Sequence, residues 1–149
     1  MLKINNNEVV ISSHNLRNKV DFINTNNLTK ITTLNNIECG LLPNGIKFIS
    51  NIYFIVGGYK LYIINSNTRT INKIISPPII CNSIVVVGEM IIFSTYNKTL
   101  IIYKIISENE IQFIQEIDSN HKDFNIEKFS ENQFVSFSLD GSLKFWGKF

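Results

Sequence analysis

The sequence lacks alanine altogether and contains only three prolines, two cysteines and one tryptophan among its 149 residues. Because alanine is the strongest helix former, its absence argues against a helical fold, and no window keeps the apolar spacing that an amphipathic helix requires. The chain is also too polar between its apolar runs to span a membrane. With 44% hydrophobic and 17% charged residues, the composition is that of one globular domain with a substantial core.

Cysteine and charge exclude further classes of protein. Cys39 and Cys81 match neither a CxxC redox pair nor a four-ligand zinc site, so we expect two buried thiols in a reducing compartment and no bound metal or cofactor. The net charge is only +2, and only Arg17 and Arg69 can form bidentate contacts with phosphate. The basic residues are scattered singly, which argues against a nucleic-acid surface. The N-terminal residues 1–10 lack the apolar core of a secretory signal, which predicts a cytoplasmic or nuclear protein.

Short apolar runs, rich in the chain's 27 isoleucines, alternate with turn residues, as is typical of strands. The runs align in four copies, in which Val20, Leu61, Leu100 and Leu143 occupy the same place. Each copy contains two strands, and further inner and outer runs bring each unit to four strands. A four-strand unit repeating at about 40 residues indicates a β-propeller blade, although solenoids and β-sandwiches also show even strand spacing. We expect an all-β propeller of about four four-stranded blades.

The fourth copy carries a specific motif. Asn120 and His121 precede it, and residues 134–146 read FVSFSLDGSLKFW. This pattern resembles the tryptophan-aspartate (WD) repeat of eukaryotic scaffold propellers, although Gly147 stands where an aspartate is usual and Asn120 where a glycine is usual. In that family an aspartate, a histidine, a serine and a tryptophan form a buried hydrogen-bonded set that supports the blade. The resemblance assigns this structural set to His121, Ser136 or Ser138, Asp140 and Trp146.

The resemblance implies a partial or open WD-type propeller in a single domain, with blades at approximately 1–34, 35–77, 78–118 and 119–149. The last blade has only three strands, and the run at residues 1–4 is used in the first blade. Family propellers usually have more than four blades, so we expect two uncovered sheet faces and an unpaired edge strand at Leu143 to Trp146. Such surfaces aggregate unless they are covered. We therefore expect a protein partner or self-association to complete the propeller.

No arrangement of side chains indicates an enzyme. The two histidines, His14 and His121, have no nearby cysteine and no nucleophilic GxSxG serine, and the resemblance favours a structural role for His121. Candidate binding residues lie instead in two turns between second and third strands, which correspond to the partner-facing rim of the family. They are Tyr59, Lys60, Tyr96, Asn97 and Lys98. Exposed tyrosine beside lysine is typical of interface hot spots, although Tyr59 and Tyr96 could also pack across their own turns.

The sequence therefore predicts a non-catalytic protein–protein interaction scaffold that is a subunit of a larger eukaryotic assembly. The alternative is a shortened ribosome-associated WD scaffold that docks on the small ribosomal subunit. Neither hypothesis includes a small-molecule substrate or a membrane, and nucleic acid would be contacted only through a ribonucleoprotein. A basic stripe on one blade would favour the ribosome, whereas uncharged rims with apolar flanks would favour protein partners alone.

Overall fold

The computed structural model describes residues 1–13, 18–38, 45–77, 80–121 and 124–147. Every regular element in these residues is a β-strand, and none of them belongs to a helix that could cross a membrane. The strands form four separate antiparallel sheets, which confirms the predicted all-β fold of about four blades. His14, Arg17 and Cys39 lie outside the described residues.

Each sheet is a meander in which strands that follow one another in the chain lie side by side. We call the sheets blades 1 to 4. Blade 1 contains β1 (Leu2–Asn5), β2 (Glu8–Ser13), β3 (Lys19–Asn24) and β4 (Lys30–Leu34). Blade 2 contains β5 (Ile46–Phe48), β6 (Tyr53–Val56), β7 (Leu61–Asn65) and β8 (Thr70–Ile75). Blade 3 contains β9 (Cys81–Val87), β10 (Met90–Thr95), β11 (Thr99–Ser107) and β12 (Glu110–Asp118). Blade 4 contains β13 (Phe124–Ser130), β14 (Gln133–Ser138) and β15 (Leu143–Gly147).

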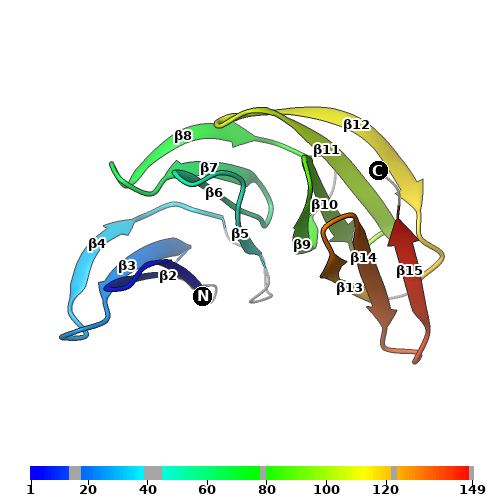
Figure 1. Cartoon of the computed structure of the whole chain (residues 1–149), viewed down its shortest axis with the longest axis horizontal. Coiled ribbons are helices and arrows are strands. Elements are labelled where there is room, and N and C mark those ends of the chain that lie inside the picture. Colours follow the sequence, from blue (N-terminus) through cyan, green and yellow to red (C-terminus); the bar gives the residue numbers. More distant parts are fainter. Residues whose placement is uncertain (14–17, 39–44, 78–79, 122–123, 148–149) are drawn as a thin grey trace.

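The four blades follow one another along an open arc, with blade 1 at one end and blade 4 at the other (Figure 1). Strands β1 and β2 pair within blade 1, as expected, so β1 is not the outer strand of blade 4. In blades 1 to 3 the third strand pairs with a fourth strand. Strand β15 pairs only with β14 among the described residues. Its outer edge therefore presents unpaired backbone groups.

Three apolar layers hold neighbouring blades together, because each sheet buries one face against the next blade. The layer between blades 1 and 2 includes Val10, Phe22, Phe54 and Ile64. The layer between blades 2 and 3 includes Ile55, Ile63, Phe93 and Tyr103. The layer between blades 3 and 4 includes Ile92, Ile102, Phe134 and Trp146. Successive side chains of a strand point to opposite faces, so the interior blades need apolar residues at almost every strand position.

The repeat in the sequence corresponds to this packing. Val20, Leu61 and Leu100 each belong to the layer that joins their blade to the following one, and all three are fully buried. Leu143 occupies the same place in blade 4, and 56% of its surface is exposed. The difference arises because no described blade follows blade 4.

Gly57 lies where blades 2 and 3 approach each other. A Cβ atom at this position would come within 2.5 Å of Ile84 Cδ1 and 2.9 Å of Cys81 Sγ, which is closer than van der Waals contact allows. The Cys81 thiol is buried, and this burial raises its pKa. A buried thiol that stays protonated is a poor nucleophile and a poor metal ligand, so Cys81 acts as a small apolar side chain.

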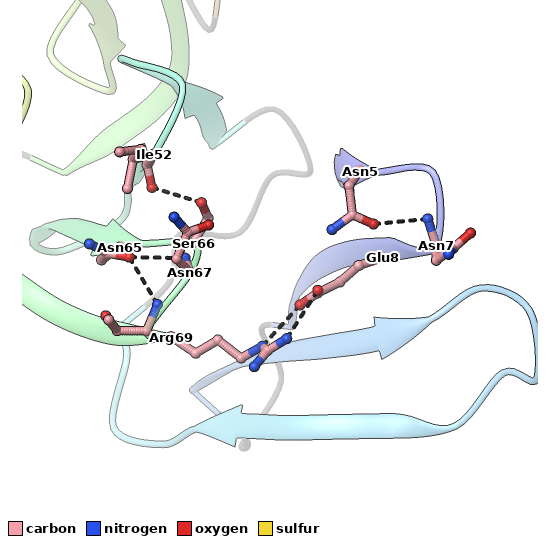
Figure 2. A network of polar contacts seen from close by, with 9 residues as sticks. Asn5, Asn7, Glu8, Ile52, Asn65, Ser66, Asn67 and Arg69 are labelled. Atoms are coloured by element: carbon pink, nitrogen blue, oxygen red, sulfur yellow. Dashed lines mark hydrogen bonds and ion pairs between the residues drawn. The ribbon is translucent and has the colours of Figure 1, made fainter.

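One ion pair joins blade 1 to blade 2 (Figure 2). Arg69 Nε and Nη2 donate to the two carboxylate oxygens of Glu8, each at 3.1 Å. The Glu8 side chain is only 9% exposed, and the guanidinium carbon lies 5.8 Å from the ring centroid of Phe22. The hydrogen bond that Arg69 donates to Glu8 raises the pKa of Arg69 above its ordinary value. A planar fork is needed to satisfy both oxygens of a nearly buried carboxylate.

The turn that presents Arg69 is held by Asn65. Its carboxamide oxygen accepts hydrogen bonds from the N–H groups of Asn67 and Thr68, each at 2.9 Å, and its carbonyl accepts from the N–H of Arg69 at 2.9 Å. Asparagine is suited to this arrangement because its side chain replaces a backbone acceptor in a tight turn. Figure 2 shows the Arg69 side chain extending from this turn to the Glu8 carboxylate.

We expect Arg69→Met to lower the free energy of unfolding by about 2–4 kcal/mol, because it leaves the Glu8 carboxylate buried without its partner. Arg69→Lys should cost less, about 1–2 kcal/mol, since a single ammonium cannot reach both oxygens equally well. Urea denaturation measures both. Lys104→Met is the control, because the Lys104–Glu89 pair is exposed and 3.6 Å long, and it should cost under about 1 kcal/mol. Equal losses for Arg69→Met and Lys104→Met would contradict the assignment.

Candidate functional site

The residues assigned to the WD set lie in and beside blade 4. Trp146, on β15, donates a hydrogen bond from Nε1 to Ser136 Oγ on β14 at 2.8 Å. Its ring stacks on Phe134, with centroids 5.8 Å apart and planes 4° from parallel. The paired strands place Trp146 directly opposite Phe134. Ser136 is fully buried, so this hydrogen bond satisfies a polar group that water cannot reach.

His121 is buried at the start of blade 4. Its backbone N–H donates to Ser119 Oγ at 3.2 Å, and Lys144 Nζ donates to the Ser119 carbonyl at 2.6 Å. Burial lowers the pKa of His121, the nearby Lys144 ammonium lowers it further, and the Asp140 carboxylate opposes this shift. The imidazole is therefore held in its neutral form near pH 7.

Asp140 lies in the β14–β15 turn and is exposed. Its carboxylate accepts the Ser142 N–H at 2.8 Å, and its own N–H lies 3.4 Å from Ser138 Oγ. Hydrogen bonds from the side chain and backbone of Ser142 lower the pKa of the Asp140 carboxyl, and a hydrogen bond with the Ser138 hydroxyl contributes to the shift. Asp140 thus stabilises its own turn, and its charge influences the pKa of His121. The resemblance placed this carboxylate in a buried set, whereas its position here is at the surface.

The candidate binding residues lie in two equivalent turns. Tyr59 and Lys60 lie between β6 and β7, whereas Tyr96, Asn97 and Lys98 lie between β10 and β11. The side chain of Tyr59 is 52% exposed and that of Tyr96 is 42% exposed. Both rings therefore present a large part of their surface to solvent. Because the two turns are equivalent in neighbouring blades, they lie on one rim of the arc.

Each of these turns is anchored by a connection between blades, namely the one that enters blade 2 and the one that leaves blade 3. The Tyr59 N–H donates to the Glu38 carbonyl at 3.1 Å, and Lys60 Nζ donates to Glu38 Oε1 at 2.9 Å. The hydrogen bond to Glu38 raises the pKa of Lys60. In blade 3, the Ser119 N–H donates to the Lys98 carbonyl at 2.8 Å, and the Ser119 hydroxyl donates to the same oxygen. These bonds hold the turns and leave the tyrosine side chains outward.

Two further residues belong to this rim and were not predicted. Leu139, in the equivalent turn of blade 4, is 86% exposed, and Glu38 neutralises the charge of Lys60. Leu139 lies four residues before Leu143, and Tyr96 lies four residues before Leu100, so the repeat alignment could have identified it. Glu38 could not have been identified in this way, because its proximity depends on the path of a connection outside the strands. We call Tyr59, Tyr96 and Leu139 the rim apolar residues.

Three solved structures have the same fold as this chain. The chain is similar to the structure of U3-55K, with a TM-score of 0.76 and 8% identity over 99% of this chain and 47% of that one. It is similar to the crystal structure of RRP9 WD40 repeats, with a TM-score of 0.74 and 8% identity over 98% of this chain and 46% of that one. It also resembles the computationally designed Ika4 protein, with a TM-score of 0.70 and 12% identity over 96% and 86% of the two chains.

No protein-family model matches the sequence, and no curated protein matches it. At 8–12% identity, the structural likeness concerns the fold alone. The chain spans about half the length of the U3-55K and RRP9 structures. The four blades therefore form a WD-repeat propeller fold that is open, as the sequence predicted.

We expect Trp146→Ala to lower the free energy of unfolding by about 3 kcal/mol, because it removes the stacked ring and leaves the buried Ser136 hydroxyl unpaired. Trp146→Phe keeps an aromatic ring on Phe134 and should cost about 1 kcal/mol. Asp140→Ala should have the smallest effect of the three, since its carboxylate is exposed. Chemical denaturation followed by circular dichroism tests this order. A loss from Asp140→Ala as large as that from Trp146→Ala would contradict it.

We expect His121 to make stability depend on pH. Its pKa in the folded chain lies below the ordinary value of 6.5, so the unfolded chain binds the proton more readily. The free energy of unfolding should therefore fall as the pH is lowered through about 6.5, and the loss should end below the folded pKa. The free energy of unfolding should depend less on pH in His121→Gln. His14 is present in both proteins, so the difference between them reports on His121. Thermal unfolding at several pH values measures the difference, and identical slopes would contradict the expectation.

Proposed function

We propose that this chain is a non-catalytic protein–protein interaction scaffold that binds a protein partner through the rim apolar residues. The observation that carries the proposal is the position of Tyr59, Tyr96 and Leu139. Each lies in the turn between the second and third strands of its blade, and each exposes a large apolar side chain. Equivalent turns of neighbouring blades repeat at the spacing of the blades, so the three side chains offer a row of contacts to one partner.

The chemistry of this rim favours a protein surface. Tyrosine provides a rigid apolar ring and a hydroxyl group, and it is enriched among the residues that dominate binding energy. Lys60 is neutralised by Glu38, so its amino group adds little net charge beside Tyr59. Asn97 and Lys98 are exposed and supply polar contacts at the border, as is usual around an apolar interface centre.

The ion pairs argue against docking on the phosphates of a ribonucleoprotein. Six basic side chains of the described residues lie within 4 Å of a carboxylate, namely Lys19, Lys47, Lys60, Arg69, Lys104 and Lys128. A phosphate-binding surface requires basic groups that are free to replace counterions. We therefore favour a protein partner over the alternative of docking on the small ribosomal subunit.

Catalysis has no comparable support. A surface hollow between blades 3 and 4 is bordered by Val87, Glu89 and Lys104, and a second is bordered by Phe48, Lys128 and Glu131. In each hollow the lysine is paired with the glutamate. Neither contains a histidine, a cysteine or a pair of carboxylates that could act as acid and base. We propose no enzymatic activity for this chain.

Affinity purification of the tagged chain from cells that express it naturally tests the proposed function. We expect a stoichiometric protein partner, and we expect Tyr59→Ser/Tyr96→Ser to reduce its recovery at least about tenfold, because hot-spot aromatics carry most of the binding energy. Leu28→Ser/Ile106→Ser is the matched control. These two residues are also large, apolar and exposed, but Leu28 lies in the turn after β3 and Ile106 lies near the end of β11, away from the rim. Equal loss in both double variants, or no partner with the unaltered chain, would contradict the proposal.

A further inference from the structure

Each end of the arc exposes one sheet face, which we call a flank. The strand positions on the two flanks are equivalent to those that pack neighbouring blades together in the interior of the arc. We call the face that a blade turns toward the following blade its forward face, and the opposite one its rear face. Equivalent cross-strand pairs lie on the four forward faces. They are Val10–Phe22, Ile55–Ile63, Ile92–Ile102 and Val135–Phe145. The first three pairs are buried, whereas Phe145 is 62% exposed.

The exposed forward face of blade 4 is mainly apolar on β14 and β15, whereas β13 places Asn125 and Glu127 opposite Phe137 and Val135. Leu143 and Phe137 face each other across β14 and β15, and both are exposed. Phe129, on β13, contacts Phe145 edge to face, with ring centroids 5.2 Å apart. The five apolar side chains of this face are Phe129, Val135, Phe137, Leu143 and Phe145. A face with three phenylalanines is expected to be covered by another apolar surface.

The rear face of blade 1 is its structural counterpart. In blades 2 to 4 the equivalent rear-face pairs are Phe54–Ile64, Ile91–Tyr103 and Phe134–Trp146, and each packs on the preceding blade. In blade 1 this pair is Val9–Ile23. Val9, Ile11 and Ile23 are all partly exposed, because no described blade precedes them.

This rear face also carries charged groups, because Lys3 lies opposite Val9, Lys30 lies opposite Ile23, and Lys19 forms an ion pair with Asp21. Asp21 accepts a hydrogen bond from Thr33 Oγ1 at 2.5 Å and forms an ion pair with Lys19 Nζ at 2.7 Å. Lys144 occupies the equivalent position on the rear face of blade 4, where it faces the preceding blade and binds the Ser119 carbonyl. A paired charge at this position is therefore compatible with packing between blades.

We propose that a second copy of this chain covers both flanks, with the forward face of blade 4 of each copy packed on the rear face of blade 1 of the other. The arc spans 46% of the length of the RRP9 WD40-repeat structure, so two copies supply about one ring. Each copy offers one forward face and one rear face, which is the requirement for a head-to-tail pair that closes on itself. The pair forms a ring of eight blades, within the range known for propellers. This inference concerns the flanks and does not depend on the rim.

The size of the flanks favours a closed pair over a single contact. A blade face of three or four strands and about five residues per strand covers roughly 300 Å². One interface between two faces therefore buries about 600 Å², which is below the usual range for a stable complex. A closed pair has two interfaces and buries about 1,200 Å², which reaches that range.

Light scattering on the purified chain tests the proposal. At concentrations up to about 100 μM, we expect a molar mass twice the 17.1 kDa of one chain. Phe145→Asp and Ile23→Asp, each of which places a charge on one flank, should raise the dissociation constant at least about 100-fold. The matched control is Ile74→Asp, since Ile74 lies on the outer strand β8 and is exposed to a similar extent as Phe145. This variant should remain a dimer.

Circular dichroism establishes whether each variant is folded. If Phe145→Asp is unfolded, Leu143→Lys replaces it as the variant that places a charge on the blade 4 flank. A monomeric unaltered chain would overturn the proposal. So would dimers that persist in the folded Phe145→Asp or Ile23→Asp variant, or assemblies larger than two chains. The rim residues are unchanged in Phe145→Asp, so this variant should still recover the rim partner. Loss of the dimer can therefore be distinguished from failure of the proposed function.

Discussion

The packing of one sheet face on the next is the constraint on which the rest of this structure depends. A single blade cannot bury its apolar faces by itself, so each blade is stabilised by its neighbours, as in other repeat proteins. This requirement explains why the interior strands, such as β7 and β10, are apolar on both faces. It also explains why Leu143 is exposed although Val20, Leu61 and Leu100, at the same place in the repeat, are buried.

Polar groups within these layers are tolerated where their hydrogen bonds are complete. Glu8 is nearly buried between blades 1 and 2 and receives both donors of the Arg69 fork. Ser136 is buried between blades 3 and 4 and accepts a hydrogen bond from the Trp146 indole N–H. Such pairs add directional contacts to layers that are otherwise held by non-directional apolar packing, and so they favour one alignment of neighbouring blades.

The arrangement of the blades separates two kinds of surface. The rim apolar residues lie in turns, where a change of side chain does not alter the packing of the sheets. The flanks consist of strand residues whose equivalents form the apolar layers in the interior of the arc. A partner on the rim and a second copy on the flanks would therefore use different residues, and each surface can be altered without removing the other.

The sequence by itself determined the class of fold, the number of sheets and the residues of most strands. Alternating apolar runs, separated by turn residues and repeated four times, specify strands and blades because side-chain direction has a period of two. The same repeat located the two tyrosine-bearing turns. Only the tertiary structure decided that Asp140 lies at the surface, that Arg69 reaches Glu8 and that Glu38 neutralises Lys60. These contacts join residues far apart in the chain or depend on the path of a connection, and no local pattern encodes such distances.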